Sequence, residues 1–248
     1  LFHAYLERQS YLDRQLVSDL RDLQDRKRPL LHIGTSPWRG STLMPDILPL
    51  FEEQYPDVQV VLHEAPVPEL GELAEANVID FCVMQPPNDL AELTYESVMR
   101  ERVFLVGHRD HPRLQELEST YDAPRPFPDL RLLEHERVIM LPPEWRLSRL
   151  LYNTFSVHSV EPQNILITTN TTTAINLAAE KMGFAFLQES GVSRTPYLDR
   201  LGCFTLGEPP LTCPLAVVYK KNGFLSPAAR AFIDLVKDFY SRYDRAGE

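Results

Sequence analysis

Apolar positions along the chain follow two periods, one typical of strands and one typical of helices. Short apolar runs predict strands at 30–33, 58–62, 79–84, 98–107, 137–141, 164–168, 184–187 and 215–219. Between them, apolar residues three or four positions apart predict helices that begin near 41, 68, 147, 172 and 226. Strands that alternate with helices build parallel βαβ units, so the pattern predicts an α/β protein. Because the order restarts after a proline-containing loop, we expect two similar lobes.

The first 28 residues predict a long helix of their own. They contain neither glycine nor proline, and Pro29 ends the pattern. One apolar stripe runs along this helix through Phe2, Tyr5, Leu12, Leu16, Leu20 and Leu23. We expect the stripe to pair with a second copy of the chain, so that the protein forms a dimer or a tetramer. The alternative is that it packs on its own domain.

The net charge and the cysteine content limit the kinds of function that the chain can have. The net charge is −10, and a surface that binds nucleic acid needs clustered Lys and Arg, so we expect no DNA contact from this part of the protein. Neither a membrane-length apolar stretch nor a secretion signal is evident, which favours a cytoplasmic setting. We interpret Cys82, Cys203 and Cys213 as buried thiols, although Cys203 and Cys213 could also pair as a redox switch.

Two Trp-Arg pairs occupy equivalent places in the two lobes. Trp38-Arg39 lies in GTSPWRGS and Trp145-Arg146 lies in EWRLS, and each pair joins a strand to a helix. Ligands of open parallel sheets bind beyond the carboxyl ends of strands, where helix N-termini attract anions and a guanidinium can fork onto a carboxylate. The pattern therefore indicates a small-molecule cleft between the lobes. The alternative is that both tryptophans cover apolar cores and both arginines point into solvent.

Signatures of enzymes are missing from the sequence. It contains no GxSxG elbow, no P-loop and no dinucleotide-binding glycine fingerprint, so we expect no catalytic activity and no cofactor. His108 and His111 are the one histidine pair with a spacing that suggests metal ligands. They lie in a proline-containing turn without a third ligand nearby, so we do not expect a metal site.

Several segments resemble one known family when they are taken in order. LHIG is followed by LMPDILPLFEEQYPDVQVVLHE, in which Leu43, Pro45, Phe51 and the Tyr55–Val58 run carry the resemblance. VIDF, His111-Pro112, GFAFLQES and SPAARAF follow at fitting distances, although Ala185 and Gln188 depart from the family's pattern. The whole chain thus resembles the effector-binding domain of LysR-type transcriptional regulators.

This resemblance implies an architecture. It implies an α/β fold of two Rossmann-like lobes with mixed, mainly parallel sheets, of the periplasmic-binding-protein type 2-like kind, preceded by a long linker helix. Residues 1–28 would be the linker and dimerisation helix, 29–107 with 214–248 regulatory lobe I, and 108–213 regulatory lobe II. An N-terminal winged helix-turn-helix, absent from this sequence, would bind promoter DNA. An effector bound between the lobes would alter oligomer geometry and so DNA binding.

The resemblance also implies a set of ligand contacts at the ends of strands. With the two arginines of the Trp-Arg pairs they are Ser36, Pro37, Trp38, Arg39, Ser41, Thr42, Ala65, Gln85, Pro142, Glu144, Trp145, Arg146, Asn170, Thr171 and Gln188. For Ser41 and Thr42, helix capping is the alternative role. Glu144 would repel a purely anionic ligand unless it pairs with Arg146. We expect a carboxylate or aromatic metabolite as the effector. A solute-binding protein for a transporter, which uses the same two-lobed cleft, is the alternative function.

Overall fold

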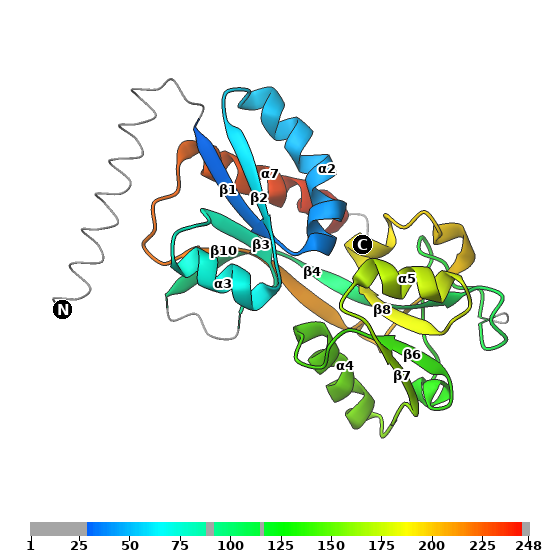
Figure 1. The fold of residues 1–248 in the computed structure, drawn as a ribbon. Coiled ribbons are helices and arrows are strands. Elements are labelled where there is room, and N and C mark those ends of the chain that lie inside the picture. The colour runs from blue at the N-terminus through cyan, green and yellow to red at the C-terminus, as the bar shows by residue number, and fades with distance from the viewer. Residues whose placement is uncertain (1–28, 88–91, 115–116, 245–248) are drawn as a thin grey trace.

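The first lobe is built from the two ends of the described chain. The computed structural model describes residues 29–87, 92–114 and 117–244, so the predicted helix over residues 1–28, with its stripe, lies outside the described residues. Lobe I contains the elements β1 (Leu30–Thr35), α2 (Pro37–Gln54), β2 (Gln59–Glu64), α3 (Val67–Glu75), β3 (Phe81–Met84), β10 (Thr212–Lys220) and α7 (Pro227–Asp244). Figure 1 shows α2 and α7 on one face of its strands and α3 on the other.

The second lobe repeats this order of strands and helices. It contains β6 (Arg137–Met140), α4 (Arg146–Val157), β7 (Asn164–Ile167), α5 (Thr171–Ala179), β8 (Phe184–Gln188), α6 (Glu189–Val192) and β9 (Leu201–Thr205). Three short elements complete it: β5 (Arg125–Pro126) and the 3-10 helices η1 (Leu130–Leu133) and η2 (Leu198–Arg200). The sequence pattern missed β5, β9 and α6.

One long strand joins the two lobes. β4 (Leu93–His108) pairs with β10 through Leu93–Arg102, and with β8 and β9 through Val103–His108. The strand order along the sheet is β2-β1-β3-β10-β4-β8-β6-β7. The outer strands of each lobe are parallel, whereas β4 and β10 run antiparallel to their neighbours. A continuous strand therefore connects two sheets that each carry their own helices (Figure 1).

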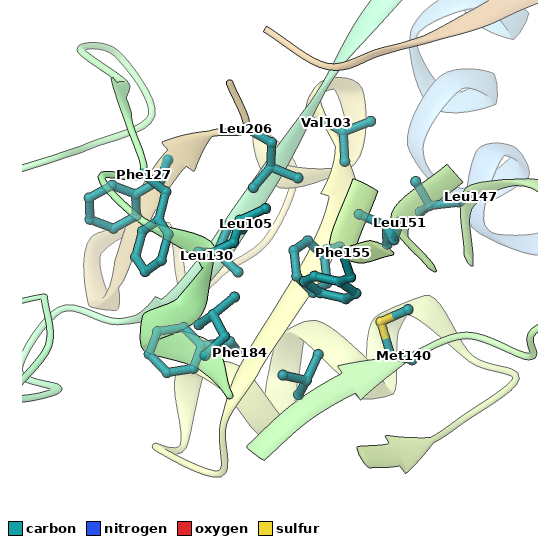
Figure 2. Close-up of a cluster of buried hydrophobic side chains, with 14 of the residues drawn as sticks. Val103, Leu105, Phe127, Leu130, Met140, Leu147, Leu151, Phe155, Phe184 and Leu206 are labelled. Carbon is teal, nitrogen blue, oxygen red and sulfur yellow. The ribbon is translucent and has the colours of Figure 1, made fainter. Parts of the chain in front are cut away.

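Each lobe has its own apolar core on both faces of its sheet. In lobe I, Ile33, Phe51 and Phe232 pack between the sheet and the helices α2 and α7, and Leu70 of α3 covers the other face. In lobe II, Leu151 and Phe155 of α4 pack on one face of the sheet, as Figure 2 shows, and α5 covers the other. The sheets are buried on both faces, as expected for parallel strands between helices.

The helix α2 begins earlier than the sequence pattern predicts. We expected it to begin at Ser41, but it begins at Pro37, because Ser36 caps it and accepts a hydrogen bond from the Arg39 amide at 3.2 Å. Proline suits the first helical position, where an amide hydrogen has no partner in the helix. Trp38 and Arg39 consequently lie within the first helical turn instead of before it. The helix also continues past Pro49, although proline in a helix interior usually kinks or ends the helix.

The remaining boundaries differ from the predicted ones by a few residues at most helix and strand ends. The largest difference is at β4, which begins at Leu93 and not at Val98. Among the described residues, no helix combines the length and the apolarity that a membrane span requires.

Candidate functional site

The predicted ligand contacts gather at the carboxyl ends of strands in both lobes. Trp38 and Arg39 follow β1, Ala65 and Gln85 follow β2 and β3, and Trp145 with Arg146 opens α4 after β6. The second lobe adds Asn170 and Thr171 at the start of α5 and Gln188 at the end of β8. Each Trp-Arg turn contacts a segment of the opposite lobe. The Arg146 guanidinium donates a hydrogen bond to the Pro86 carbonyl oxygen at the end of β3, and Trp38 packs against Gly191 of α6.

Arg39 forms a buried ion pair. Its Nη2 lies 2.6 Å from Oε2 of Glu101 on β4, and its Nη1 donates to Glu101 Oε1 at 3.4 Å and to the Tyr240 hydroxyl at 3.3 Å. Arg39 is 4% exposed and Glu101 is 0% exposed. Burial alone lowers the pKa of Arg39, but the Glu101 carboxylate and Tyr240 outweigh it and hold the pKa above its usual value. Arg39 is therefore charged and neutralised inside the protein.

Glu101 also connects this pair to the second lobe. Its Oε1 accepts a hydrogen bond from the Ser190 hydroxyl on α6. The carboxylate thus joins α2 and α7 of lobe I, through Arg39 and Tyr240, to α6 of lobe II. Removing one member of such a buried pair typically costs 3–5 kcal/mol, because the other charge is left uncompensated, so about that much stability depends on this junction.

Trp38 lies so close to Gly191 of lobe II that no residue larger than glycine fits at position 191 without a shift. A Cβ atom added to Gly191 would lie 2.0 Å from Cζ2 of the Trp38 indole. Within the described part of the chain, the buried Nε1 of Trp38 has no hydrogen-bond partner. A buried donor without a partner costs about 1–3 kcal/mol. The indole therefore fills the space between α2 and α6 with one polar group unsatisfied.

Gln85 has a second unsatisfied donor near the same carboxylate. It is 9% exposed, and its Nε2 lacks a hydrogen-bond partner among the described residues. The Gln85 amide lies beside the Cys213 thiol and favours its charged form, but the sulfur is a weak acceptor and leaves Nε2 without a full hydrogen bond among the described residues. Cys213 is the residue of β10 paired with Glu101 of β4. Burial raises the pKa of Cys213 to about 11, so this thiol is neutral and weakly reactive at physiological pH.

Two further contacts hold α6 against its surroundings. Arg102 of β4 donates from Nε to Oε2 of Glu189 at 2.9 Å. Arg194, just after α6, forms an ion pair with Asp46 of α2. The short helix α6 and the residue Arg194 after it therefore provide contacts to both α2 and the connecting strand.

Several predicted contacts make hydrogen bonds within their own helices. Asn170 Oδ1 accepts from the amides of Thr172 at 2.9 Å and Thr173 at 3.2 Å, so it caps α5 as Ser36 caps α2. The hydroxyls of Ser41 and Thr42 donate to the Trp38 carbonyl oxygen, at 2.9 Å and 3.0 Å. These hydroxyl groups can still accept a hydrogen bond from a ligand, because each retains oxygen lone pairs.

The other predicted contacts differ in exposure. Pro37 and Glu144 are exposed, Gln188 is half-buried, and the buried ones are Ala65, Pro142 and Thr171. Trp145 is half-buried and packs against the lobe II core, which includes Leu147 and Leu151. Within the described chain, the salt bridges include no pair between Glu144 and Arg146.

Sequence reasoning missed Glu101, Ser190, Gly191 and Tyr240. One of them had a readable signal. Met99, Glu101, Val103 and Leu105 alternate along β4 and are all buried, so a carboxylate stands in a row of inward-facing apolar side chains. A buried carboxylate needs a cation, and this requirement alone would have directed attention to the region. The other three lie far from Glu101 in sequence, and no local pattern singles them out.

The histidine pair and the cysteines, for which the sequence predicts no metal site, have other neighbours in the structure. His108 and His111 lie 3.7 Å and 3.5 Å from carboxylate oxygens of Asp110 and Glu136. No group of side chains suited to hold a metal ion occurs among the described residues. The three cysteines are free and buried, and burial raises the pKa of Cys82 and Cys203 to about 12.

A separate hollow of about 330 Å³ lies on lobe II. It shares no residue with the junction around Glu101. Its lining is formed by residues at the end of β4, the end of α5 and η2: His108, Arg109, Asp110, Ala179, Glu180, Lys181, Asp199 and Arg200.

Comparison with known proteins identifies the family. Residues 24–241 match the model of the LysR substrate binding domain. The HTH-type transcriptional regulator YvbU of Bacillus subtilis (strain 168) is 24% identical over 219 residues, which cover 85% of this chain and 67% of that protein.

Solved structures share the same fold. The effector-binding domain of BenM with its effector benzoate has a TM-score of 0.71 at 20% identity, covering 87% of this chain and 94% of that one. The effector-binding domain of QuiR in complex with shikimate has a TM-score of 0.70 at 15% identity, covering 87% and 99%.

The family match confirms the two-lobed fold and favours a regulator over a transport protein or an enzyme. The match extends over residues 24–241, which include nearly the whole described chain. The chain belongs to the LysR substrate-binding domain family and is the effector-binding domain of a LysR-type transcriptional regulator.

Proposed function

We propose that a small-molecule effector binds between the two lobes, at the junction around Glu101. The observation that carries this proposal is a pair of buried donors, Trp38 Nε1 and Gln85 Nε2, that find no hydrogen-bond partner among the described residues. They lie beside contacts that cross from one lobe to the other. BenM binds benzoate and QuiR binds shikimate, and both are carboxylates on a six-membered carbon ring. A carboxylate or aromatic metabolite therefore remains the class we propose for this chain.

The proposed contacts are the strand-end residues of both lobes. They are Ser36, Pro37, Trp38, Ser41, Thr42, Ala65, Gln85, Pro142, Glu144, Trp145, Arg146, Asn170, Thr171 and Gln188. We assign Arg39 a different part in this proposal: Glu101 already occupies its guanidinium, so it fixes the junction and does not receive the ligand. In the described part of the chain, Arg146 bonds a neutral carbonyl oxygen, which it can exchange for a ligand.

A bound ligand can replace the contacts between the lobes with contacts of its own. α4, α6 and the residue Arg194 after α6 reach lobe I through single residues, namely Arg146, Ser190, Gly191 and Arg194. β4, in contrast, runs through both lobes without a break. An effector that binds one arrangement of the lobes better than another shifts their equilibrium by that difference in affinity. The continuous strand provides the hinge for this motion.

We propose that the protein acts as a homodimer or homotetramer in the cytoplasm, where promoter DNA is accessible. The outer strand of each lobe exposes apolar side chains, with Leu62 of β2 at 36%, Ile165 of β7 at 39% and Ile167 of β7 at 55%. Exposed strand edges of this kind are ready to pair with another chain. The predicted helix over residues 1–28 would add a second contact. Light scattering at micromolar concentration is expected to show a dimer or larger, and a monomer would contradict this part of the proposal.

In the full-length protein, effector binding would alter how an N-terminal winged helix-turn-helix binds promoter DNA. The proposed boundaries are residues 1–28 for the linker helix, 29–107 with 214–248 for lobe I, and 108–213 for lobe II. The effector-binding domain alone is expected to show no sequence-dependent shift of DNA in a gel.

Thermal denaturation with a metabolite panel tests the central part of this proposal. A ligand at 100 times its Kd stabilises the folded state by about 2.7 kcal/mol, which raises the Tm measurably. We expect Trp38→Ala and Trp145→Ala to reduce this ligand-induced rise while the variants stay folded. Phe224→Ala is the matched control, because Phe224 is 59% exposed and lies outside the junction. A full ligand-induced rise in both tryptophan variants would contradict the site.

A further inference from the structure

The two donors without partners among the described residues are each connected to the Glu101 carboxylate through one neighbouring residue. Gln85 lies beside Cys213, which faces Glu101 across β10 and β4. Trp38 packs on Gly191, whose neighbour Ser190 donates to Glu101. Both groups are N–H donors that cannot accept a hydrogen bond. Their complement is a ligand that brings acceptor oxygens, as a carbonyl or a carboxylate does.

The ion pairs around the junction leave one arginine, Arg146, without a carboxylate partner among the described residues. The Arg39 guanidinium and the Glu101 carboxylate neutralise each other, as do Arg102 with Glu189 and Arg194 with Asp46. Arg146 contributes to the electrostatics of Cys213, so its charge lies close to the junction. Among the described side chains, the salt bridges include no carboxylate partner for Arg146. A single positive charge therefore remains for a ligand.

We propose that the effector is an uncharged or singly negative molecule whose carbonyl or carboxylate oxygens accept hydrogen bonds from Trp38 Nε1 and Gln85 Nε2. Arg146 leaves the Pro86 carbonyl and balances the single negative charge when there is one. This inference rests on the proposed function and names the ligand chemistry of the same site. A doubly charged ligand, such as a phosphate monoester, leaves one charge without compensation in a buried place and is rejected.

Arg39 does not enable the site to bind a doubly charged ligand. Its guanidinium already makes the forked contact with a carboxylate that an anionic ligand would require. To bind a dianion, Arg39 would have to abandon Glu101, which is 0% exposed and would be left buried and unpaired. The protein's own carboxylate thus occupies the cation that a second negative charge would need.

The indole N–H signals of the whole chain provide a direct readout. The sequence has two tryptophans, so a spectrum of the chain labelled with ¹⁵N-tryptophan contains two indole signals, and Trp145→Phe assigns them. The probes are benzamide, benzoate and phenyl phosphate, which share a ring and differ in charge. At concentrations up to about 50 mM, suited to weak millimolar binding, we expect benzamide and benzoate to move the Trp38 signal saturably. Phenyl phosphate is expected to move it at least about tenfold more weakly.

A matched pair of glutamine variants completes the test. Gln85→Leu removes the second donor and is expected to weaken benzoate and benzamide about tenfold, the size of one hydrogen bond to a buried acceptor. Gln54→Leu is the control, because Gln54 is exposed on α2, and it is expected to change nothing.

Three results would overturn the inference. They are a Trp38 signal that no probe moves, a preference for phenyl phosphate, and equal affinity in Gln85→Leu. If a metabolite from the thermal panel binds between the lobes while the Trp38 signal stays fixed, the ligand chemistry is wrong and the proposed function stands. If the panel yields no ligand between the lobes, the proposed function itself fails.

Discussion

The two Trp-Arg turns have the same dipeptide and the same place in the fold, yet their side chains have different surroundings. Arg39 is buried and paired with Glu101, whereas Arg146 is half-buried and donates to a carbonyl oxygen. Trp38 packs on the opposite lobe with an unsatisfied N–H, and Trp145 packs against the core of its own lobe. Local sequence thus places both pairs at a strand-to-helix joint. Residues far away in the chain determine that Arg39 forms a buried ion pair and that Arg146 bonds a neutral carbonyl oxygen.

The largest effect is expected from removing the partner of Arg39. Glu101→Ala leaves a guanidinium buried without its carboxylate, so we expect a loss of 3–5 kcal/mol in the free energy of unfolding, about the cost of an unpaired buried charge. Urea denaturation measures it. The double variant Arg39→Met/Glu101→Leu should recover most of the loss, because no charge is then buried. If Glu101→Ala costs less than about 1 kcal/mol, the pair is not the fixed junction described above.

An intermediate effect is expected at the contact between Trp38 and Gly191. Gly191→Val places a side chain where the indole lies, and such overpacking typically costs about 1–3 kcal/mol. Trp38→Ala should relieve this cost, so a double-mutant cycle is expected to show strong coupling between the two positions. Independent, additive effects would show that the lobes do not meet there in solution.

A smaller effect on stability is expected at Arg146. Arg146→Ala removes one hydrogen bond to a carbonyl oxygen, worth about 1 kcal/mol, and leaves no buried charge behind. Its effect on a singly negative ligand should be larger than its effect on stability. Isothermal titration with benzoate and benzamide separates the two, since only the charged probe should lose affinity. Equal losses for both probes would contradict the role of Arg146 as the balancing charge.

The smallest effect is expected at a partly exposed charge cluster of lobe I, which contrasts with the buried pair. Partial burial raises the pKa of Glu96, but hydrogen bonds from Lys237, Tyr219 and Arg230 outweigh it and hold the pKa at about 2. The pKa is lowered on folding, so the carboxylate stabilises the folded state above pH 4.5 and this contribution disappears as the pH falls toward 2.

Glu96→Gln checks this sign. It should cost less than about 1 kcal/mol at neutral pH, as expected for a partly exposed pair, and the difference from the unaltered protein should shrink below pH 4.5. Denaturation curves at several pH values measure the difference. A gap that widens as the pH falls would show that the sign is wrong.

Much of the fold follows from the sequence, because burial on both faces of the sheets makes the strands apolar runs. The boundaries of β6, β7 and β8 agree with the predicted strands within one residue. The early start of α2 was missed because Pro37 was treated as part of a turn, although proline suits a first helical position. α6 has four residues, which is too short for any helical period to show.

The site was less predictable than the fold. Strand ends were identifiable, since each follows an apolar run, and both Trp-Arg turns lie there. The pairing of Arg39 with Glu101 spans 62 residues of sequence, and no local pattern reveals which distant side chain reaches which arginine. The partner of Arg39 is set by the fold, because the folded sheet brings the inward face of β4 against the first turn of α2.

A crystal structure of the chain with the most stabilising metabolite of the thermal panel tests the central claim most directly. We predict a ligand at the junction of the two lobes that accepts hydrogen bonds from Trp38 Nε1 and Gln85 Nε2 while Arg39 remains paired with Glu101. A ligand bound to Arg39 in place of Glu101, or one bound in the hollow formed by His108 and Arg200, would contradict it.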